Sequence, residues 1–276
     1  MTPSALLKLL AEVEHGSITP EAAADRLAIL PFEDLGHARV DHHRSLRTSL
    51  PEVVFAAGKT PEQVADIVSS LVADGVDVLV TRADSAAAQA VLARHPAATH
   101  NSVARTIALR QSPASSEPQG RIAVVCAGTS DIPVAEEAAI AAETFGSRVC
   151  RLYDVGVAGL HRLLAVRDEL KQAHAIVVCA GMEGALPSVV GGLVSVPVIA
   201  VPTSVGYGAS FAGAAALLGM LNSCSPTSPW STSITDSAPP IPRCSSLARL
   251  RDPPPDPISA RQPYLPLTIG VIVHFS

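Results

Sequence analysis

Aromatic and charged residues are both scarce in this chain. Of its 276 residues, only 3% are aromatic and 16% are charged, whereas 48% are hydrophobic. The core must therefore be built from Ala, Val, Leu and Ile, a composition that suits helices packed on a parallel sheet of short aliphatic strands. The length is sufficient for one large domain or two small ones.

Basic charge and long apolar runs are also missing. The net charge of −5 leaves no basic footprint of the kind that nucleic-acid-binding proteins carry, so a phosphate-bearing ligand would be held by local groups. No apolar run approaches the roughly 18 residues that a membrane span needs. The N-terminal stretch MTPSALLKLLAEVEHG carries a charge too early for a signal peptide. We therefore expect a soluble, cytoplasmic protein with no nucleic-acid or membrane partner.

The cysteines form no CxxC pair and are odd in number. Several lie in apolar, strand-like runs, where a reduced and buried thiol is the ordinary interpretation. The five are Cys126, Cys150, Cys179, Cys224 and Cys244.

Composition divides the chain into three regions and a linker. Residues 1–110 predict a helical hairpin followed by a small α/β domain, with strands at PEVVF, VDVLVT and RTIALR and a helix at TPEQVADIVSSLVADG. Residues 111–120, rich in Ser, Pro and Gly, predict a linker. Residues 225–276 hold about half of the 23 prolines and many serines, which predicts a mostly disordered tail in which only LTIGVIVHF suits a strand.

The region 121–224 alternates strand and helix. Its strands are RIAVVCAG, RVCRLYDVG, AIVVCAG and VPVIAVP, and a helix is expected after each, including one over GLHRLLAVRDELKQA and a last one over GASFAGAAALLGMLNSC. Repeated βα units predict a parallel sheet with right-handed crossovers in a three-layer, flavodoxin-like α/β domain. Ligands of such folds bind at the carboxyl ends of the strands.

Three short stretches at those strand ends carry candidate chemistry. Gly128-Thr129-Ser130-Asp131 lies where backbone amides at a helix start suit a phosphate or carboxylate, although Ser130 or Asp131 capping the helix is equally favoured. Glu183, flanked by Gly181-Met182 and Gly184, suits proton transfer or is an exposed loop acid. Gly206-Tyr207-Gly208 suits a tight loop whose ring stacks on a ligand or packs over the loop.

Two further features have competing interpretations. Cys224 follows the last helix outside any aliphatic run, where a thiol can be exposed and reactive if its pKa is lowered, although a silent thiol is favoured on sequence alone. Asp41-His42-His43-Arg44 looks like a metal or phosphate site, but solvated surface is the favoured interpretation because adjacent histidines do not face one way on a strand.

Several long strings, taken together, resemble a known superfamily. GTSDIPVAEEAA resembles the signature of the aminoimidazole ribonucleotide carboxylase superfamily, whose PurE-like fold it implies. The two histidines of the purine enzymes are absent, because their places read YDVGVAG and EGALPS. DHHR, GKTPEQ, AGMEGALPSVVGGL and PTSVGYGASF through MLNSC are similar to the branch that makes pyridinium-3,5-biscarboxylic acid mononucleotide, a precursor of the nickel-pincer cofactor. The resemblance covers most of residues 1–224.

That resemblance implies a reaction and a site. The family carboxylates the pyridinium ring of nicotinic acid adenine dinucleotide and hydrolyses its pyrophosphate, releasing AMP. The co-substrate is CO2 or bicarbonate, and Mg²⁺ assists the reaction. The resemblance also implies a homo-oligomer, by resemblance an octamer. By motif, Cys224 is the nucleophile and Glu183 the base, with Asp131 as a further catalytic group or a holder of ribose or a cation. The implied substrate-binding residues are Gly128, Thr129, Ser130, Asp154, Gly181, Met182, Gly184, Gly206, Tyr207 and Gly208. No metal ligands are predicted.

The chain departs from this family after its last matching string. Cys224-Ser225-Pro226 is followed by TSPWSTSITDSAPPIP where the branch continues with an aliphatic strand and a glycine-rich turn. We hypothesise that the reading frame shifted at or just after Pro226. Three functions therefore remain open: an active pyridinium carboxylase and hydrolase, an N5-carboxyaminoimidazole ribonucleotide mutase, or a non-catalytic nucleotide-binding remnant.

Overall fold

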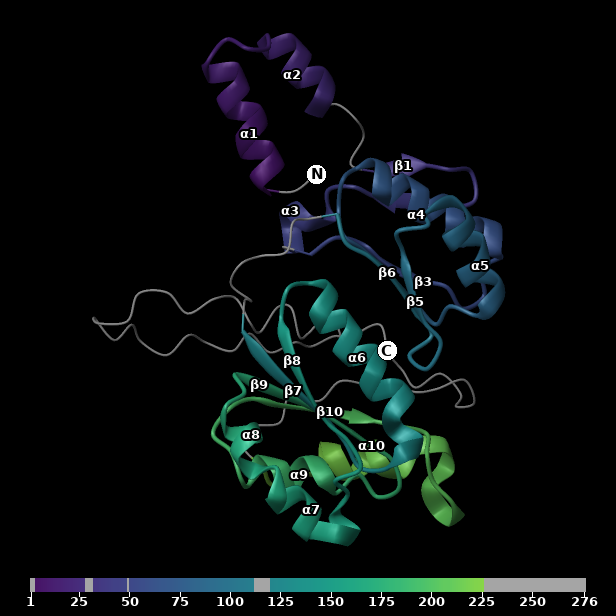
Figure 1. Cartoon of the computed structure of the whole chain (residues 1–276), viewed down its shortest axis with the longest axis vertical. Helices are drawn as coiled ribbons and strands as arrows, with labels where there is room; N and C mark the ends of the chain where they lie inside the picture. The colour runs from purple at the N-terminus through teal and green to yellow at the C-terminus, as the bar shows by residue number, and fades with distance from the viewer. Residues whose placement is uncertain (1–2, 28–31, 49, 112–119, 226–276) are drawn as a thin grey trace, which may run out of the picture.

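The computed structural model describes residues 3–27, 32–48, 50–111 and 120–225 (Figure 1). The helices are α1 (Pro3–Glu14), α2 (Pro20–Leu27), α3 (Arg44–Thr48), α4 (Pro61–Ala73), α5 (Ser85–Arg94), α6 (Ile132–Thr144), α7 (Leu160–Ala165), α8 (Arg167–Lys171), α9 (Leu186–Gly191) and α10 (Ala214–Leu221). The strands are β1 (Phe32–Asp34), β2 (Arg39–Asp41), β3 (Val53–Phe55), β4 (Val78–Thr81), β5 (Thr99–Asn101), β6 (Thr106–Leu109), β7 (Arg121–Cys126), β8 (Arg148–Leu152), β9 (Ala175–Ala180) and β10 (Val198–Pro202). Short 3₁₀ helices are η1 (Thr129–Asp131), η2 (Val157–Gly159) and η3 (Gly208–Gly213).

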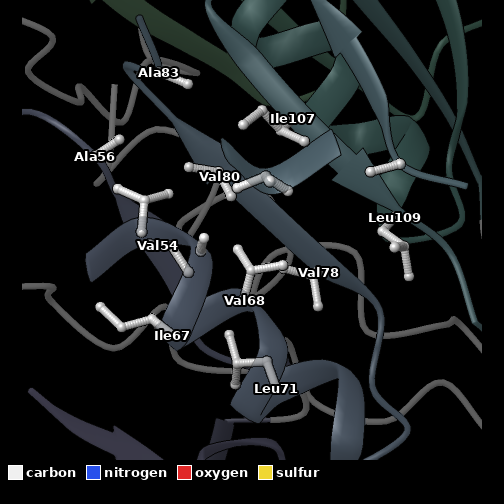
Figure 2. Packing of buried hydrophobic residues seen from close by; sticks show 14 of the residues in the cluster. Val54, Ala56, Ile67, Val68, Leu71, Val78, Val80, Ala83, Ile107 and Leu109 are labelled. Carbon is white, nitrogen blue, oxygen red and sulfur yellow. The ribbon is translucent and has the colours of Figure 1, made fainter. Parts of the chain in front are cut away.

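The N-terminal part is a smaller α/β unit built on a mixed sheet. Its strand order is β3-β4-β6-β5, with β3 parallel to β4 and β6 antiparallel to both of its neighbours. Helix α4 begins in a capping box, in which Thr60 accepts from the amide of Gln63 and Gln63 accepts from that of Thr60. One face of the sheet packs against α4 and α5 through aliphatic side chains such as Val54, Val68 and Val80 (Figure 2).

The second sheet is parallel throughout and has the order β10-β9-β7-β8. Numbered within the region, this is the order 2-1-3-4, which confirms the flavodoxin-like arrangement expected from the βα repeat. Helix α6 covers one face, and α7 to α10 supply Leu163, Leu170, Leu186, Val190 and Met220 to the core on the other face. Because the strands are parallel, the loops that follow them all emerge at one edge of the sheet, the carboxyl end of the strands.

Helix α6 belongs to both units. Its apolar residues pack on the parallel sheet, and the same core contains Val53 and Leu79 from the N-terminal sheet. Contacts of α6 with β4 and β6 on one side and with β7, β8 and β9 on the other place the helix between the two sheets (Figure 1). The N-terminal unit is therefore joined to the second one through a shared hydrophobic core.

The expected elements of the described segments are present, with two differences. The expected helix over GLHRLLAVRDELKQA is divided at Val166 into α7 and α8, and the expected last helix begins only at Ala214. Phe211 and Ala212, with φ of 46° and 53°, lie in the left-handed region and delay its start. Within the described segments, no helix has the length and apolarity to span a bilayer. The predicted disordered tail beyond Ser225, including Cys244, lies outside the described residues.

Candidate functional site

Four loops meet at the carboxyl edge of the parallel sheet. They follow β7, β8, β9 and β10 and contain Gly128–Asp131, Asp154, Gly181–Gly184 and Thr203–Gly208 respectively. These are the loops in which the sequence predicted ligand-binding residues. The order β10-β9-β7-β8 makes the loops after β7 and β9 the central pair.

Asp131 is the centre at which three of these loops are tied together. Its carboxyl group is almost fully buried, with 3% of the residue exposed. The hydroxyl of Thr203 donates to Oδ1 at 2.6 Å, and the amide of Gly128 donates to Oδ2 at 3.0 Å. The backbone of Gly181 donates a further hydrogen bond. The interpretation of Asp131 as an ordinary cap of α6 is wrong, because its side chain makes no cap hydrogen bond to that helix.

Burial gives this carboxyl group unusual acid–base chemistry. Desolvation raises the pKa of Asp131 above its ordinary value, although the hydrogen bonds from Thr203, Gly128 and Gly181 act in the opposite direction. A carboxyl group with a raised pKa at the mouth of a sheet can exchange a proton with a ligand nearer to neutral pH than an exposed aspartate can. Thr129 and Ser130, by contrast, are exposed, so their hydroxyl groups face solvent at the same edge.

The loops after β9 and β10 approach each other so closely that only glycine fits. A Cβ added to Gly181 would lie 2.1 Å from the carbonyl oxygen of Val205, and the amide of Met182 donates to that same oxygen at 2.7 Å. Gly206 is packed similarly against the side chain of Ser210. Met182 takes a left-handed φ of 53°. Gly181 and Gly206, which the sequence predicted to bind a ligand, therefore also allow the loops after β9 and β10 to pack together.

Glu183 is exposed and is held through its backbone. A Cβ on Gly219 of α10 would lie 2.4 Å from the carbonyl oxygen of Glu183, and a Cβ on Gly184 would lie 2.6 Å from that of Ala216. The small residues of α10 thus let the helix pack on the 181–184 loop of the same chain. The Glu183 side chain remains accessible, as the predicted role in proton transfer requires.

Asp154 lies in the loop after β8 with a left-handed φ of 58°. Its carboxylate forms an ion pair with Arg162 at 2.7 Å, and both side chains are partly exposed. The Arg162 side chain also packs against Gly159. The site residue predicted here is therefore at the expected edge, but its charge is already paired.

Tyr207 and Phe211 form the aromatic part of the site. Their exposed fractions are 82% and 75%, the largest among the exposed hydrophobic residues of the described chain. Gly208 between them takes a φ of 61° with open space around it. The alternative in which Tyr207 packs over its own loop is wrong, because its side chain is exposed to solvent.

Cys224 differs from the other described cysteines in its exposure. Cys126 and Cys179 are buried in neighbouring strands, where desolvation raises the pKa of Cys126 to about 11 and that of Cys179 well above its ordinary value. Cys224 is exposed. It follows Ser223, whose hydroxyl lies 2.7 Å from that of Ser188 in α9. Cys150 is half-buried, so Cys224 is the most exposed thiol of the described residues.

Cys224 and Asp131 are positioned by different elements of the fold. Gly213, just before α10, packs on the backbone of Thr203, the partner of Asp131. Cys224 lies beyond the other end of that helix, whose eight residues span about 12 Å. Gly128, Asp131 and Gly181 are thus gathered at one position, whereas Cys224 lies beside α9.

The loop Thr203–Gly208 is expected from the sequence to close over a ligand, but the sequence assigned no role of their own to Thr203 and Val205. Thr203 is 1% exposed and binds Asp131, and Val205 supplies the carbonyl oxygen that receives Met182. Their position directly after a strand end was the available signal.

The interpretation of His42 as solvated surface is wrong, since its side chain is 10% exposed and lies 3.2 Å from Glu33 and 3.6 Å from Asp74.

Comparisons with known proteins match both units. A family model described as the LarB/PurE-like N-terminal domain matches residues 32–111, and one described as AIR carboxylase matches residues 121–239. An uncharacterized protein of Methanocaldococcus jannaschii is 34% identical to this chain over 229 residues, which cover 80% of this chain and 88% of that protein. The second family model spans the parallel sheet and all four loops of the site.

Proposed function

The chain belongs to the LarB/PurE-like family of the carboxylase-type superfamily, and on that premise we propose that it carboxylates the pyridinium ring of nicotinic acid adenine dinucleotide and hydrolyses the pyrophosphate. The products would be pyridinium-3,5-biscarboxylic acid mononucleotide and AMP, in nickel-pincer cofactor biosynthesis. The observation that carries the proposal is the buried Asp131, tied to three loops at the edge where this fold binds ligands.

The ring chemistry requires a nucleophile because a pyridinium ring is too electron-poor to attack CO2. In the proposed reaction the thiolate of Cys224 forms a bond to a ring carbon, and the ring nitrogen accepts the displaced electron pair. The resulting enamine-like ring forms a carbon–carbon bond to CO2. A base, proposed to be Glu183, then removes the proton from the carboxylated carbon, and expulsion of the thiolate restores the aromatic ring. The exposure of both side chains supports these roles.

Phosphate and ribose are proposed to bind on the Gly128–Asp131 side. The exposed hydroxyls of Thr129 and Ser130 and the start of α6 offer donors to an anion. Tyr207 and its glycines are proposed to close over the ring. Hydrolysis is the addition of water to phosphorus with AMP as the leaving group.

Magnesium is proposed as an aid to that hydrolysis because it neutralises phosphate charge. The described segments contain no group of three or more His, Cys, Asp or Glu side chains arranged to hold a metal. The described residues therefore offer no dedicated metal site of this kind, and no step is assigned to the ion. A family-like homo-octamer is part of the same proposal.

The test is incubation of the purified protein with nicotinic acid adenine dinucleotide, ¹³C-bicarbonate and Mg²⁺, followed by mass spectrometry. We expect a labelled biscarboxylated mononucleotide and AMP in equal amounts. Cys224→Ala should abolish both, whereas Cys150→Ala, at a half-buried cysteine away from the loops, should leave them unchanged. Turnover of an aminoimidazole ribonucleotide carbamate instead would identify the purine-type mutase. Dinucleotide binding without product would identify a non-catalytic remnant.

A further inference from the structure

A buried ion pair joins the N-terminal unit to α6. Arg82, in the turn after β4, places Nε 3.2 Å from Oε2 of Glu137, and the two side chains are 9% and 4% exposed. Arg105, before β6, contributes a second positive charge near Glu137. Both arginines take left-handed φ values, 56° and 53°, and the amide of Ala83 donates to the Arg105 carbonyl at 2.7 Å. The turn that presents Arg82 is therefore held in a defined shape.

The contact between the N-terminal sheet and α6 is mostly apolar, but polar groups surround this ion pair. Leu79 and Ala108 pack toward α6, whereas Val80 and its partner Ile107 face α4 and α5. Because side chains alternate along a strand, Thr81 and Thr106 face α6 as well. Both threonine hydroxyls and Oε1 of Glu137 are buried and have no hydrogen-bond partner within the described residues. Burying these groups is costly, which argues for a role beyond packing.

The pair lies close to the candidate site along the same helix. Glu137 follows Asp131 by six residues, which corresponds to about 9 Å along an α-helix. Asp131 stands at the start of α6, and its carboxyl oxygens must meet donors from two other loops. A helix that turned or slid by a fraction of a turn would separate those groups. The placement of α6 against the N-terminal sheet therefore bears directly on Asp131.

We propose that Arg82 is a positioning residue, which holds Glu137 and thereby fixes α6 so that the Asp131 carboxyl group meets Gly128, Gly181 and Thr203. This gives the N-terminal unit a role in the site through its contact with α6. The kinetic consequence rests on the proposed function, whereas the structural consequence does not.

The direct readout is the backbone amide of Gly128, which donates to Oδ2 of Asp131. In ¹⁵N-labelled full-length protein its chemical shift should titrate with Asp131 and its hydrogen exchange should be slow. In Arg82→Met, which keeps the aliphatic stem, we expect at least ten-fold faster exchange at Gly128 and a titration midpoint moved toward that of an ordinary aspartate. Glu137→Gln, which keeps the shape of the side chain, should produce the same changes more weakly.

Arg94→Met is the matched control. It removes an ion pair of 2.6 Å with Asp66 in the same unit, but on exposed side chains away from α6. Gly128 should be unchanged in this variant. In the carboxylation assay, Arg82→Met should lower kcat by roughly ten- to a hundred-fold with little change in KM, since misplacement of a reacting group acts on the chemical step.

The proposal would be overturned if Arg82→Met folds and its Gly128 amide has the same exchange rate and titration midpoint as in the wild-type protein. The melting temperature of the variant does not affect this conclusion. If Arg82→Met does not fold, the same result in Glu137→Gln decides against it. A lack of carboxylation by the wild-type protein would remove the proposed function but leave the Gly128 result standing, so the two failures are distinguishable.

Discussion

Two buried carboxyl groups, one just before α6 and one within it, have the same exposure and different partners. Asp131 and Glu137 are each 3% exposed, and burial raises the pKa of both. Asp131 accepts hydrogen bonds from uncharged donors on three loops of the parallel unit, whereas Glu137 faces Arg82 across the boundary between the units. Burial thus raises the pKa of both carboxyl groups. Their partners differ, so Asp131 connects loops within the parallel unit, whereas Glu137 connects the two units.

Of the substitutions that test this comparison, Asp131→Ala should cause the largest loss of stability and of turnover. It leaves the Thr203 hydroxyl and the amides of Gly128 and Gly181 without their acceptor, at about 3 kcal/mol or more of unfolding free energy. Turnover should fall by at least roughly 100-fold. Urea denaturation and the carboxylation assay measure the two effects.

Asp84→Ala is the comparison for that change. Asp84 accepts one hydrogen bond from the amide of Ala87 at the start of α5, so its loss should cost about 1 kcal/mol. Equal losses in the two variants would show that Asp131 is only another helix cap.

The raised pKa of Glu137 should make the free energy of unfolding depend on pH. Desolvation raises the pKa of Glu137 from 4.5 to about 7, against the charges of Arg82 and Arg105. Between these values the folded protein holds a proton that the unfolded chain has lost. This contribution is fully present below pH 4.5 and is lost as pH rises through about 7, by at most about 3 kcal/mol at 1.4 kcal/mol per pKa unit.

Glu137→Gln removes that titration. The difference in unfolding free energy between wild type and variant should therefore change in the variant's favour from pH 5 to pH 8, as measured by urea denaturation at each pH. Parallel curves over this range would mean that Glu137 titrates near its ordinary value.

Gly181→Ala should test the close approach of the loops that surround Asp131. Its new Cβ would lie 2.1 Å from a backbone oxygen, so a loop must move, at about 2 kcal/mol. Gly208→Ala is the control, since nothing lies within 4 Å and only the φ of 61° is strained, at about 1 kcal/mol. Thermal unfolding of both variants checks the order, and a larger loss at Gly208 would contradict it.

Arg162→Met should have the smallest effect. The ion pair of Arg162 with Asp154 is partly exposed on both sides, so its loss should change the unfolding free energy by no more than about 0.5 kcal/mol. A loss as large as that of Asp131→Ala in the same denaturation series would contradict the account, in which the burial of a carboxyl group decides how much its partners contribute to stability.

Most of the fold could be predicted from local sequence patterns. The aliphatic runs RIAVVCAG and AIVVCAG predicted the parallel strands correctly, because each strand is buried on both faces. The strands β1, β2 and β5 were missed because their sequences FED, RVD and THN contain no apolar run, whereas the equally short β3 was predicted from PEVVF. The early start expected for α10 failed at Phe211 and Ala212, whose left-handed backbones no propensity indicates.

The site was less predictable than the fold. Gly128, Asp131 and Gly181 could be placed at one edge because strand ends in a parallel sheet meet there. That Thr203 would be the hydroxyl bound to Asp131 depends on the three-dimensional approach of two loops. The pairing of Arg82 with Glu137 joins residues 55 positions apart in different units, and nothing local in either segment indicates it.

Titration of ¹⁵N-labelled protein with nicotinic acid adenine dinucleotide tests the central claim most directly, since the claim is that the loops around Asp131 bind this ligand. The amides of Gly128, Gly181 and Gly206 should shift together and saturably. Those of Gly75 and Gly146, after the far ends of α4 and α6, should not. Unchanged loop amides at saturating ligand, or equal shifts at the control glycines, would contradict it.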